Sequence, residues 1–333
     1  MYEQSDHTLI SPILTRKQTR EIRKVFTQGV APITCIALQS DTGRLFAGSW
    51  DKHIYAVDAQ TKQTTGRPLS GHTDFVKCLL ATSLSGKSIL LSGGADATII
   101  IWDIETGKQV HKLKGHTKSL QDLAIDPLSI PEGATGPAES FVLFSASSDR
   151  EVRRWHISLA SAHELQESLN DPILAHETSV YKLHFDSEGD LWTASADKTA
   201  AHLVRSRGWE ADTTLTHPDF VRDVVVHEAL GVVVTACRDE EVRIWDLAAG
   251  DLLCTYSGHY EEVTGLVLRG QSVVSVSIDG TVRKWGLRRQ DMELYWKELE
   301  KEADGTVDDA PKKGGVLTAE EEAELAELMD DSD

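Results

Sequence analysis

The residue types in this chain that could carry out chemistry are Ser or Thr, His and Asp, which together can supply the nucleophile, base and orienting acid of a hydrolase. They occur in repeated sets. Four segments align without gaps, and each has a hydroxyl residue four positions before an Asp and a Trp six positions after it. With the His that precedes each segment, the sets are His72, Ser92, Asp96 and Trp102; His116, Ser145, Asp149 and Trp155; His217, Thr235, Asp239 and Trp245; and His259, Ser275, Asp279 and Trp285.

This repetition argues against catalysis, because an enzyme needs one such set and four copies indicate a structural device. The sets are not accompanied by a Gly-x-Ser-x-Gly elbow, a Gly-rich phosphate loop or a His-Glu-x-x-His helix. We therefore predict that the protein is not an enzyme. No residue is assigned as catalytic or as a metal ligand, and no cofactor is expected.

The segments that position these residues read as short strands. In the second unit, apolar runs at 76–80, 88–92 and 98–102 are separated by Gly, Ser and Asp turns. Gly-His pairs mark the units, and a repeat period in the low forties is typical of a β-propeller. Two of the units are degenerate, with Val57 and Leu203 in place of Trp. By this template there are six units, with turn aspartates Asp51, Asp96, Asp149, Asp197, Asp239 and Asp279.

These recurring marks resemble the WD-repeat β-propeller family over residues 20–287. The resemblance implies an all-β, closed propeller of four-stranded blades. We favour six blades, with seven as the alternative, because residues 1–19 and 288–333 do not read as another blade. It also implies that residues 21–26 supply the outer strand of the last blade. Finally, it implies that the Trp, hydroxyl, His and Asp of each set form one hydrogen-bonded chain, so that Asp239 pairs with His217.

Family members bind partners at the end of the propeller where three positions of each unit emerge. These lie three and five residues after the His and directly before the turn Asp. Aromatic and Arg side chains, which dominate binding hot spots, are frequent there. They suggest a partner segment with an acidic residue and an apolar anchor, although some could instead pack under loops. The predicted partner-binding face consists of Trp50, Phe75, Lys77, Gln121, Tyr181, Phe220, Arg222, Arg238 and Glu262.

Composition divides the chain into an N-terminal head (1–19), the propeller (20–287) and an acidic tail (288–333) with one or two short helices. The net charge is −19, and the tail holds sixteen Asp and Glu against six Lys and Arg. Within the tail, residues 291–301 predict a helix. Further on, Leu325, Leu328 and Met329 share one helical face, which suits either a binding motif or a solubilising tail.

The remaining signals concern location and partners. No apolar run could span a membrane, the start lacks a secretory pattern, and four scattered cysteines indicate reduced thiols. We expect an intracellular protein of the cytoplasm or nucleus. Its predicted function is a non-catalytic scaffold, a subunit or adaptor of a multiprotein complex that binds other proteins. The acidic charge disfavours direct nucleic-acid binding. The alternative is an RNA-associated assembly factor that uses the basic residues of 16–24. Partner identity and oligomeric state stay open.

Overall fold

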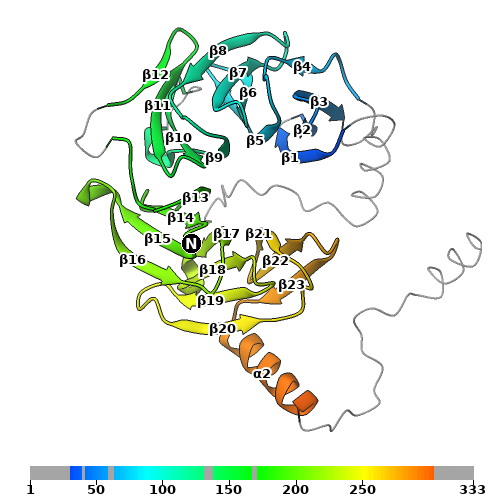
Figure 1. The fold of residues 1–333 in the computed structure, drawn as a ribbon, viewed down its shortest axis with the longest axis vertical. Coiled ribbons are helices and arrows are strands. Elements are labelled where there is room, and N and C mark those ends of the chain that lie inside the picture. The colour runs from blue at the N-terminus through cyan, green and yellow to red at the C-terminus, as the bar shows by residue number, and fades with distance from the viewer. Residues whose placement is uncertain (1–30, 40–41, 59–63, 131–137, 167–170, 304–333) are drawn as a thin grey trace, which may run out of the picture. The chain divides into compact units, whose positions relative to one another are not determined.

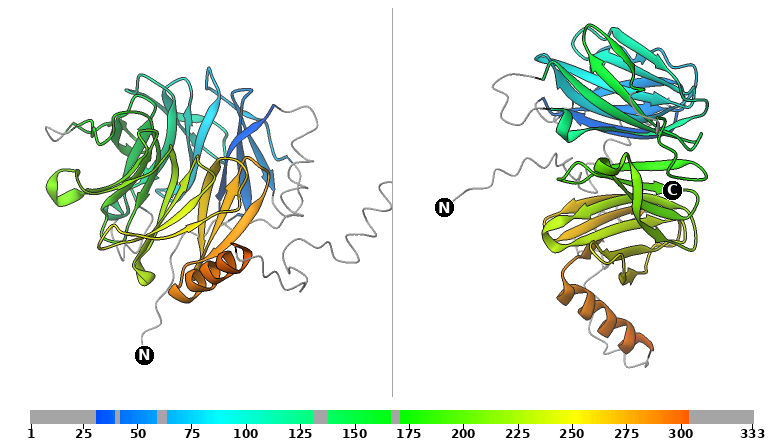
Figure 2. Two further views of the ribbon diagram at one scale, coloured as in Figure 1. Left: turned by 60° about the horizontal axis from the view of Figure 1, so that its bottom comes forward. Right: turned by 90° about the vertical axis from the view of Figure 1, so that its left-hand side faces the viewer.

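The computed structural model describes residues 31–39, 42–58, 64–130, 138–166 and 171–303. Six antiparallel sheets follow one another in chain order and are arranged around an axis as a six-bladed propeller (Figure 1). The views in Figure 2 show the same succession of sheets, from blue to orange. The chain consists of two compact units, Met1–Leu287 and Arg288–Asp333. The prediction of an all-β, six-bladed propeller is confirmed.

Each blade runs from an innermost to an outermost strand. The innermost strands are β1 (Ile33–Gln39), β5 (Val76–Leu84), β9 (Leu120–Ile125), β13 (Val180–Phe185), β17 (Val221–His227) and β21 (Val263–Arg269). The second strands are β2 (Arg44–Ser49), β6 (Lys87–Gly94), β10 (Ser140–Ser147), β14 (Leu191–Ser195), β18 (Val232–Cys237) and β22 (Ser272–Ser277). The third strands are β3 (His53–Asp58), β7 (Thr98–Asp103), β11 (Val152–Ser158), β15 (Thr199–Val204), β19 (Val242–Asp246) and β23 (Val282–Gly286). The outer strands of the first five blades are β4 (Leu69–Ser70), β8 (Gln109–Lys114), β12 (Ala162–Glu164), β16 (Glu210–Thr216) and β20 (Leu252–Tyr256).

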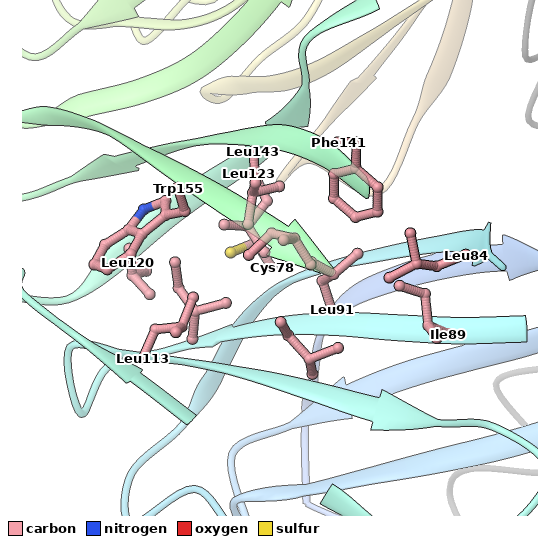
Figure 3. Packing of buried hydrophobic residues seen from close by; sticks show 13 residues of the cluster. Cys78, Leu84, Ile89, Leu91, Leu113, Leu120, Leu123, Phe141, Leu143 and Trp155 are labelled. Carbon is pink, nitrogen blue, oxygen red and sulfur yellow. The ribbon is translucent and has the colours of Figure 1, made fainter. Parts of the chain in front are cut away.

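The hydrophobic core lies between neighbouring sheets. The second strands and β7 are covered on both faces over most of their length, which is why they are rich in apolar runs such as the Thr-Ile-Ile-Ile-Trp of β7. Figure 3 shows the cluster between the second and third blades, where Leu91 and Cys78 of one sheet meet Leu120, Phe141 and Trp155 of the next. Equivalent clusters join the first blade to the second, the third to the fourth and the fourth to the fifth. Stability therefore comes from stacking blades, since a single sheet could not bury both of its faces.

The sixth blade has three strands among the described residues. Val282 of β23 is 62% exposed, whereas its counterparts Ile99, Val152, Ala200 and Val242 are buried. The strand predicted at residues 21–26 to complete this blade lies outside the described residues and stays a prediction.

Outside the sheets are three short 3-10 turns, η1 (Pro127–Ser129), η2 (Arg205–Arg207) and η3 (Glu228–Leu230), and the helix α2 (Arg289–Ala303). The helix predicted at 291–301 is thus present and slightly longer. The tail residues Leu325, Leu328 and Met329 lie outside the described residues. No helix among the described residues has the length and apolar character needed to cross a membrane.

Near the axis, side chains link one innermost strand to the next. Innermost strands of neighbouring blades belong to separate sheets, so backbone groups that face the next blade need other partners. Asp122 Oδ2 of β9 accepts from the N–H of Leu183 at 3.0 Å, and Asp223 Oδ2 of β17 accepts from the N–H of Leu266 at 2.7 Å. On the intervening strand, Lys182 Nζ lies 3.3 Å from Asp122, and this carboxylate raises the pKa of the lysine. Polar groups therefore join the third blade to the fourth and the fifth blade to the sixth.

The carboxylate of Asp223 is buried in this junction. Burial raises the pKa of Asp223 from 3.8 to about 6, although Lys182 and the two backbone N–H donors of Leu266 and Val224 act in the opposite direction. An acid whose pKa is higher in the folded state binds its proton more tightly there. As the pH rises from 3.8 to about 6, Asp223 ionises in the unfolded chain before it ionises in the folded one, so the folded state loses stability over this range and the full loss persists at higher pH.

The variant Asp223→Asn removes this titration and keeps an oxygen that can accept from Leu266. The free energy of unfolding of the variant, minus that of the wild type, should rise by about 1–2 kcal/mol between about pH 5 and pH 7.5. Urea unfolding at both pH values measures this difference. A difference that does not change with pH would show that Asp223 is not the titrating group.

Candidate functional site

The Ser, His and Asp set of the second blade is assembled as a hydrogen-bonded relay. The indole Nε1 of Trp102 donates to Ser92 Oγ at 2.8 Å, His72 Nε2 lies 2.8 Å from the same oxygen, and His72 Nδ1 lies 3.0 Å from Asp96. A carboxylate only accepts, so Nδ1 carries a proton. In the neutral imidazole, Nε2 then accepts the proton of Ser92. The relay thus connects the third strand, the second strand, the loop before the innermost strand and the turn.

This relay has the residue types of a hydrolase triad but not its accessibility. Ser92 is fully buried, and the Trp102 indole occupies a lone pair of its oxygen. Burial alone would raise the pKa of Asp96, but donors from His72, the N–H of Thr73 and Thr98 outweigh it and hold the pKa well below its ordinary value. The set is therefore a satisfied internal network that fixes backbone segments.

The relay recurs in three other blades. The distance from His Nε2 to the hydroxyl oxygen is 2.7 Å in the third, fourth and sixth blades. Their His Nδ1 atoms lie 2.9 Å, 2.9 Å and 3.1 Å from Asp149, Asp197 and Asp279. In the degenerate fourth blade, Leu203 stands at the Trp position, and the hydroxyl of Thr193 lacks an indole donor.

The fifth blade departs from the expected pairing. His217 Nε2 contacts Thr235 at 2.8 Å and Trp245 donates to Thr235 at 2.9 Å, but His217 Nδ1 donates to the carbonyl of Leu215. The prediction that Asp239 pairs with His217 was wrong. Asp239 instead accepts a bidentate pair from Arg243 at 2.6 and 3.0 Å.

Pro218 gives the physical reason. In the four other blades with this His, the turn Asp also accepts from the backbone N–H of the residue that follows the His. Pro218 occupies that position in the fifth blade and has no N–H. Asp239 therefore lacks this anchor, and Arg243, four residues further on, holds it instead. The His-Pro pair was a signal in the sequence that could have revealed the exception.

The turn aspartates hold the same geometry in all six blades. Each accepts from the N–H two residues further on, as Asp51 does from His53 in the blade that lacks both His and Trp. The residue before each Asp donates its N–H to the carbonyl of the residue predicted three positions after the His. The six pairs are Trp50 with Pro32, Ala95 with Phe75, Ser148 with Ser119, Ala196 with Ser179, Arg238 with Phe220, and Ile278 with Glu262. Two of the three predicted position types therefore lie together at one end of every blade.

The third position type coincides with a β-bulge. In each blade the register between the innermost and second strands skips one residue near this end. A bulge leaves its extra residue out of the ladder and re-aims the side chain. The six skipped residues are Thr34, Lys77, Gln121, Tyr181, Arg222 and Thr264. We call this end of the propeller, with all three position types, the bulge face.

An aromatic pair joins the first and second blades on the bulge face. The rings of Trp50 and Phe75 are stacked with centroids 5.2 Å apart and planes inclined by 14°. Trp50 is 50% exposed and Phe75 is 37% exposed. Two large apolar rings held against each other in solvent form a rigid platform with low ordering cost for a ligand.

A second cluster crosses the fourth, fifth and sixth blades. The Arg222 guanidinium lies 4.2 Å from the centre of the Tyr181 ring and forms a 2.6 Å ion pair with Glu262. Arg238 lies over Phe220 at 5.1 Å. Arg222 is therefore already neutralised by its own chain, while Arg238 is exposed. In the third blade, the predicted Gln121 donates to Ser148 at 2.7 Å.

Comparison with known proteins matches this architecture. The family profile described as "WD domain, G-beta repeat" matches residues 21–58, 62–103, 209–246 and 250–286. An uncharacterized WD repeat-containing protein of Schizosaccharomyces pombe, C126.01c, is 35% identical over 321 residues, which cover 92% of this chain and 79% of the relative. The chain belongs to the WD40 repeat family.

Two more distant relatives of this WD40 protein are a pre-mRNA-processing factor and a nuclear distribution protein. Pre-mRNA-processing factor 19 of Bos taurus is 25% identical and is matched over 59% of this chain and 36% of its own length. Nuclear distribution protein PAC1 of Coccidioides posadasii is 27% identical, over 78% of this chain and 58% of its own length. The crystal structure of the computationally designed Ika8 protein is similar with a TM-score of 0.58 and 24% identity, covering 79% of this chain and 73% of that chain. The designed protein supports the fold alone.

The WD40 propeller also carries face residues that sequence reasoning missed. Lys52 and Arg150 directly follow a turn Asp and have positive φ angles of 76° and 72°. Tyr260 follows His259 and is strongly exposed. A rule that included the residues directly after the Asp and directly after the His would have found all three.

The propeller has three further features besides these face residues. Asp186, Asp190 and His202 are close enough to hold a cation, but Asp186 accepts from loop N–H groups and from His202. His116, Asp149 and Glu151 are also close, yet His116 and Asp149 belong to a relay. A half-open hollow of about 410 Å³ beside the fourth blade is lined by Pro172, Ile173, Leu174, Ala175, Gly208, Trp209, Glu210 and Ala211. Its lining offers one ionisable group, Glu210, which by itself supplies no catalytic constellation.

Double-mutant cycles can test the exceptional fifth blade. Asp239→Ala with Arg243→Met should give a coupling energy of about 1–3 kcal/mol, because the two charges form a shielded bidentate pair. The cycle of Asp239→Ala with His217→Gln should give a coupling close to zero. Chemical unfolding of the single and double variants provides these values. A larger coupling with His217 than with Arg243 would contradict the assignment.

Proposed function

We propose that this protein is a non-catalytic interaction scaffold, a subunit or adaptor of an intracellular multiprotein complex that holds partner proteins on its bulge face. WD40 propellers generally act as scaffolds for protein interaction, and their fold alone does not name a process. The observation that carries the proposal is the exposed Trp50–Phe75 stack. It is set in a face whose positions are fixed in every blade by a bulge and a backbone bond.

The second cluster supports the same conclusion. Tyr181, Arg222 and Glu262 connect three blades, so that side chain positions on the bulge face are set before a partner arrives. Preorganised aromatic and Arg groups lower the entropic cost of binding. We place the protein in the cytoplasm or nucleus, where its four cysteines, which form no disulfide, would stay reduced. RNA association through the basic residues of 16–24 stays the alternative, and these residues lie outside the described part of the chain.

The experiment compares partner capture by the tagged full-length chain with that by two folded variants. Trp50→Ala with Phe75→Ala removes the platform, and Leu252→Ala removes an equally exposed side chain from the outer strand β20. Quantitative mass spectrometry should find a set of proteins that is lost from the first variant by at least about tenfold and kept by the second. Equal recovery with all three proteins would contradict binding at this face.

A further inference from the structure

The charges of the bulge face are divided between its two sides. Apart from the turn aspartates that every blade has, the first three blades hold four bases and one acid, Asp74, at the loop, bulge and turn positions. The fifth and sixth blades hold two bases and four acids at the same positions. In a chain of net charge −19, a local excess of bases stands out from the surrounding negative potential. We call the four bases of the first three blades the basic sector: Lys52, Lys77, Lys118 and Arg150.

The basic sector is not used by the propeller itself. None of its four side chains forms an ion pair or hydrogen bond within the part of the chain that the structure describes. The bases on the other side differ, since Arg222 pairs with Glu262 and Arg238 lies over Phe220. Three of the four residues are exposed, and Lys77 is half-buried at its bulge. An unpaired cation keeps its full capacity to bind an anion.

Backbone geometry keeps the sector in place. Lys52 and Arg150 occupy turn positions with positive φ, a conformation that favours Gly or Asn and that here carries a long base instead. Lys77 is the bulge residue of β5, which directs it out of the ladder. These positions are therefore set by the turn Asp and the bulge of their blades.

The aromatic platform lies within the same sector. Trp50 stands two residues before Lys52 in one turn, and Phe75 stands two residues before Lys77 in the neighbouring blade. An apolar ring surface is thus flanked by a cation on each of its two blades. A ligand that covers the rings can bring acidic groups to both sides of its anchor.

We propose that the basic sector and the Trp50–Phe75 platform bind a protein segment in which acidic residues flank an aliphatic or aromatic anchor. This deepens the proposed function and rests on it. The anchor covers the two rings, while carboxylates meet Lys52 and Lys77, with Lys118 and Arg150 extending the sector into the third blade. On the other side of the face, the exposed Glu240 and Glu261 repel acidic residues of the ligand. The acidic part of the bound segment therefore lies over the basic sector, which sets the direction of the segment.

A peptide fits these observations better than a nucleic acid. A phosphate backbone carries charge along its whole length. Glu177, Glu240 and Glu261 are exposed on the same face and would oppose such a strand as it left the basic sector. A peptide concentrates its acids around one anchor, which matches two bases in the blades of the platform and two more in the next blade.

The test is a selection of short random peptides displayed on phage against the full-length protein. The most enriched peptide is then synthesised, together with a version whose Asp and Glu are changed to Asn and Gln. Fluorescence anisotropy measures both peptides and a single-stranded oligouridine. The sector variant carries Gln at Lys52, Lys77, Lys118 and Arg150. The matched control carries Gln at four exposed bases of the opposite end: Lys87, Lys108, Arg207 and Arg269.

We expect enriched peptides with acidic residues around an apolar anchor. The sector variant should bind the enriched peptide at least about tenfold more weakly than the wild type at low salt, and the control variant within about twofold. The Asn and Gln version of the peptide should lose affinity to a similar degree. The Trp50→Ala and Phe75→Ala double variant should lose binding at both low and high salt.

Three results would overturn the inference. Enriched peptides without acids that still require Trp50 and Phe75 would refute the acidic ligand and leave the proposed function standing. Peptides that bind equally to the double aromatic variant would refute both. Oligouridine that binds more tightly than the peptide and depends on the basic sector would assign the sector to nucleic acid.

Discussion

The relay from indole to hydroxyl to imidazole to carboxylate is the interaction on which the rest of this structure depends. In the second blade it ties Trp102 of the third strand to Ser92, to the loop at His72 and to the turn at Asp96. These groups are buried, so any one left without its partner would cost free energy. Because the His and the Asp lie at the same end of the blade, the network that holds the sheet together also fixes the loop and turn that carry the bulge face.

This coupling explains how a repeated structural device can support a face that differs from blade to blade. The relay and the turn Asp set the backbone, and the side chains before, after and between them are free to vary. The bulge then directs one further residue per blade out of the ladder. The result is a fixed set of positions around the axis. One sector holds a stacked aromatic pair and bases without an internal ion pair, and another holds acids and Arg222, which is paired with Glu262.

Much of this arrangement could be predicted from the sequence, because the repeat carries its own register. The period, the turn aspartates and the offsets from His predicted which residues come together at one end of each blade, even in the degenerate first blade, where the N–H of Trp50 donates to the carbonyl of Pro32. Contacts between blades could not be read in this way. The stacking of Trp50 on Phe75 and the pairing of Arg222 with Glu262 join residues from different repeats, and no periodicity specifies them. Asp239 pairs with Arg243 and not with His217 because Pro218 lacks an N–H. The repeat template describes what the blades share and therefore does not reveal this local difference.

The most direct test of the central claim, that the relay positions the face, is amide hydrogen exchange of the full-length chain and its Asp149→Ala variant. The wild-type Asp149 accepts from Thr117 and from His116, and the neighbouring turn amide of Ser148 donates to Ser119. If the relay positions the face, the amides of Thr117 and Ser148 exchange faster in the variant, and those of the equivalent Thr73 and Ala95 in the second blade are unchanged. Unchanged exchange at Thr117 and Ser148 in the folded variant would show that the face is held in place without the relay.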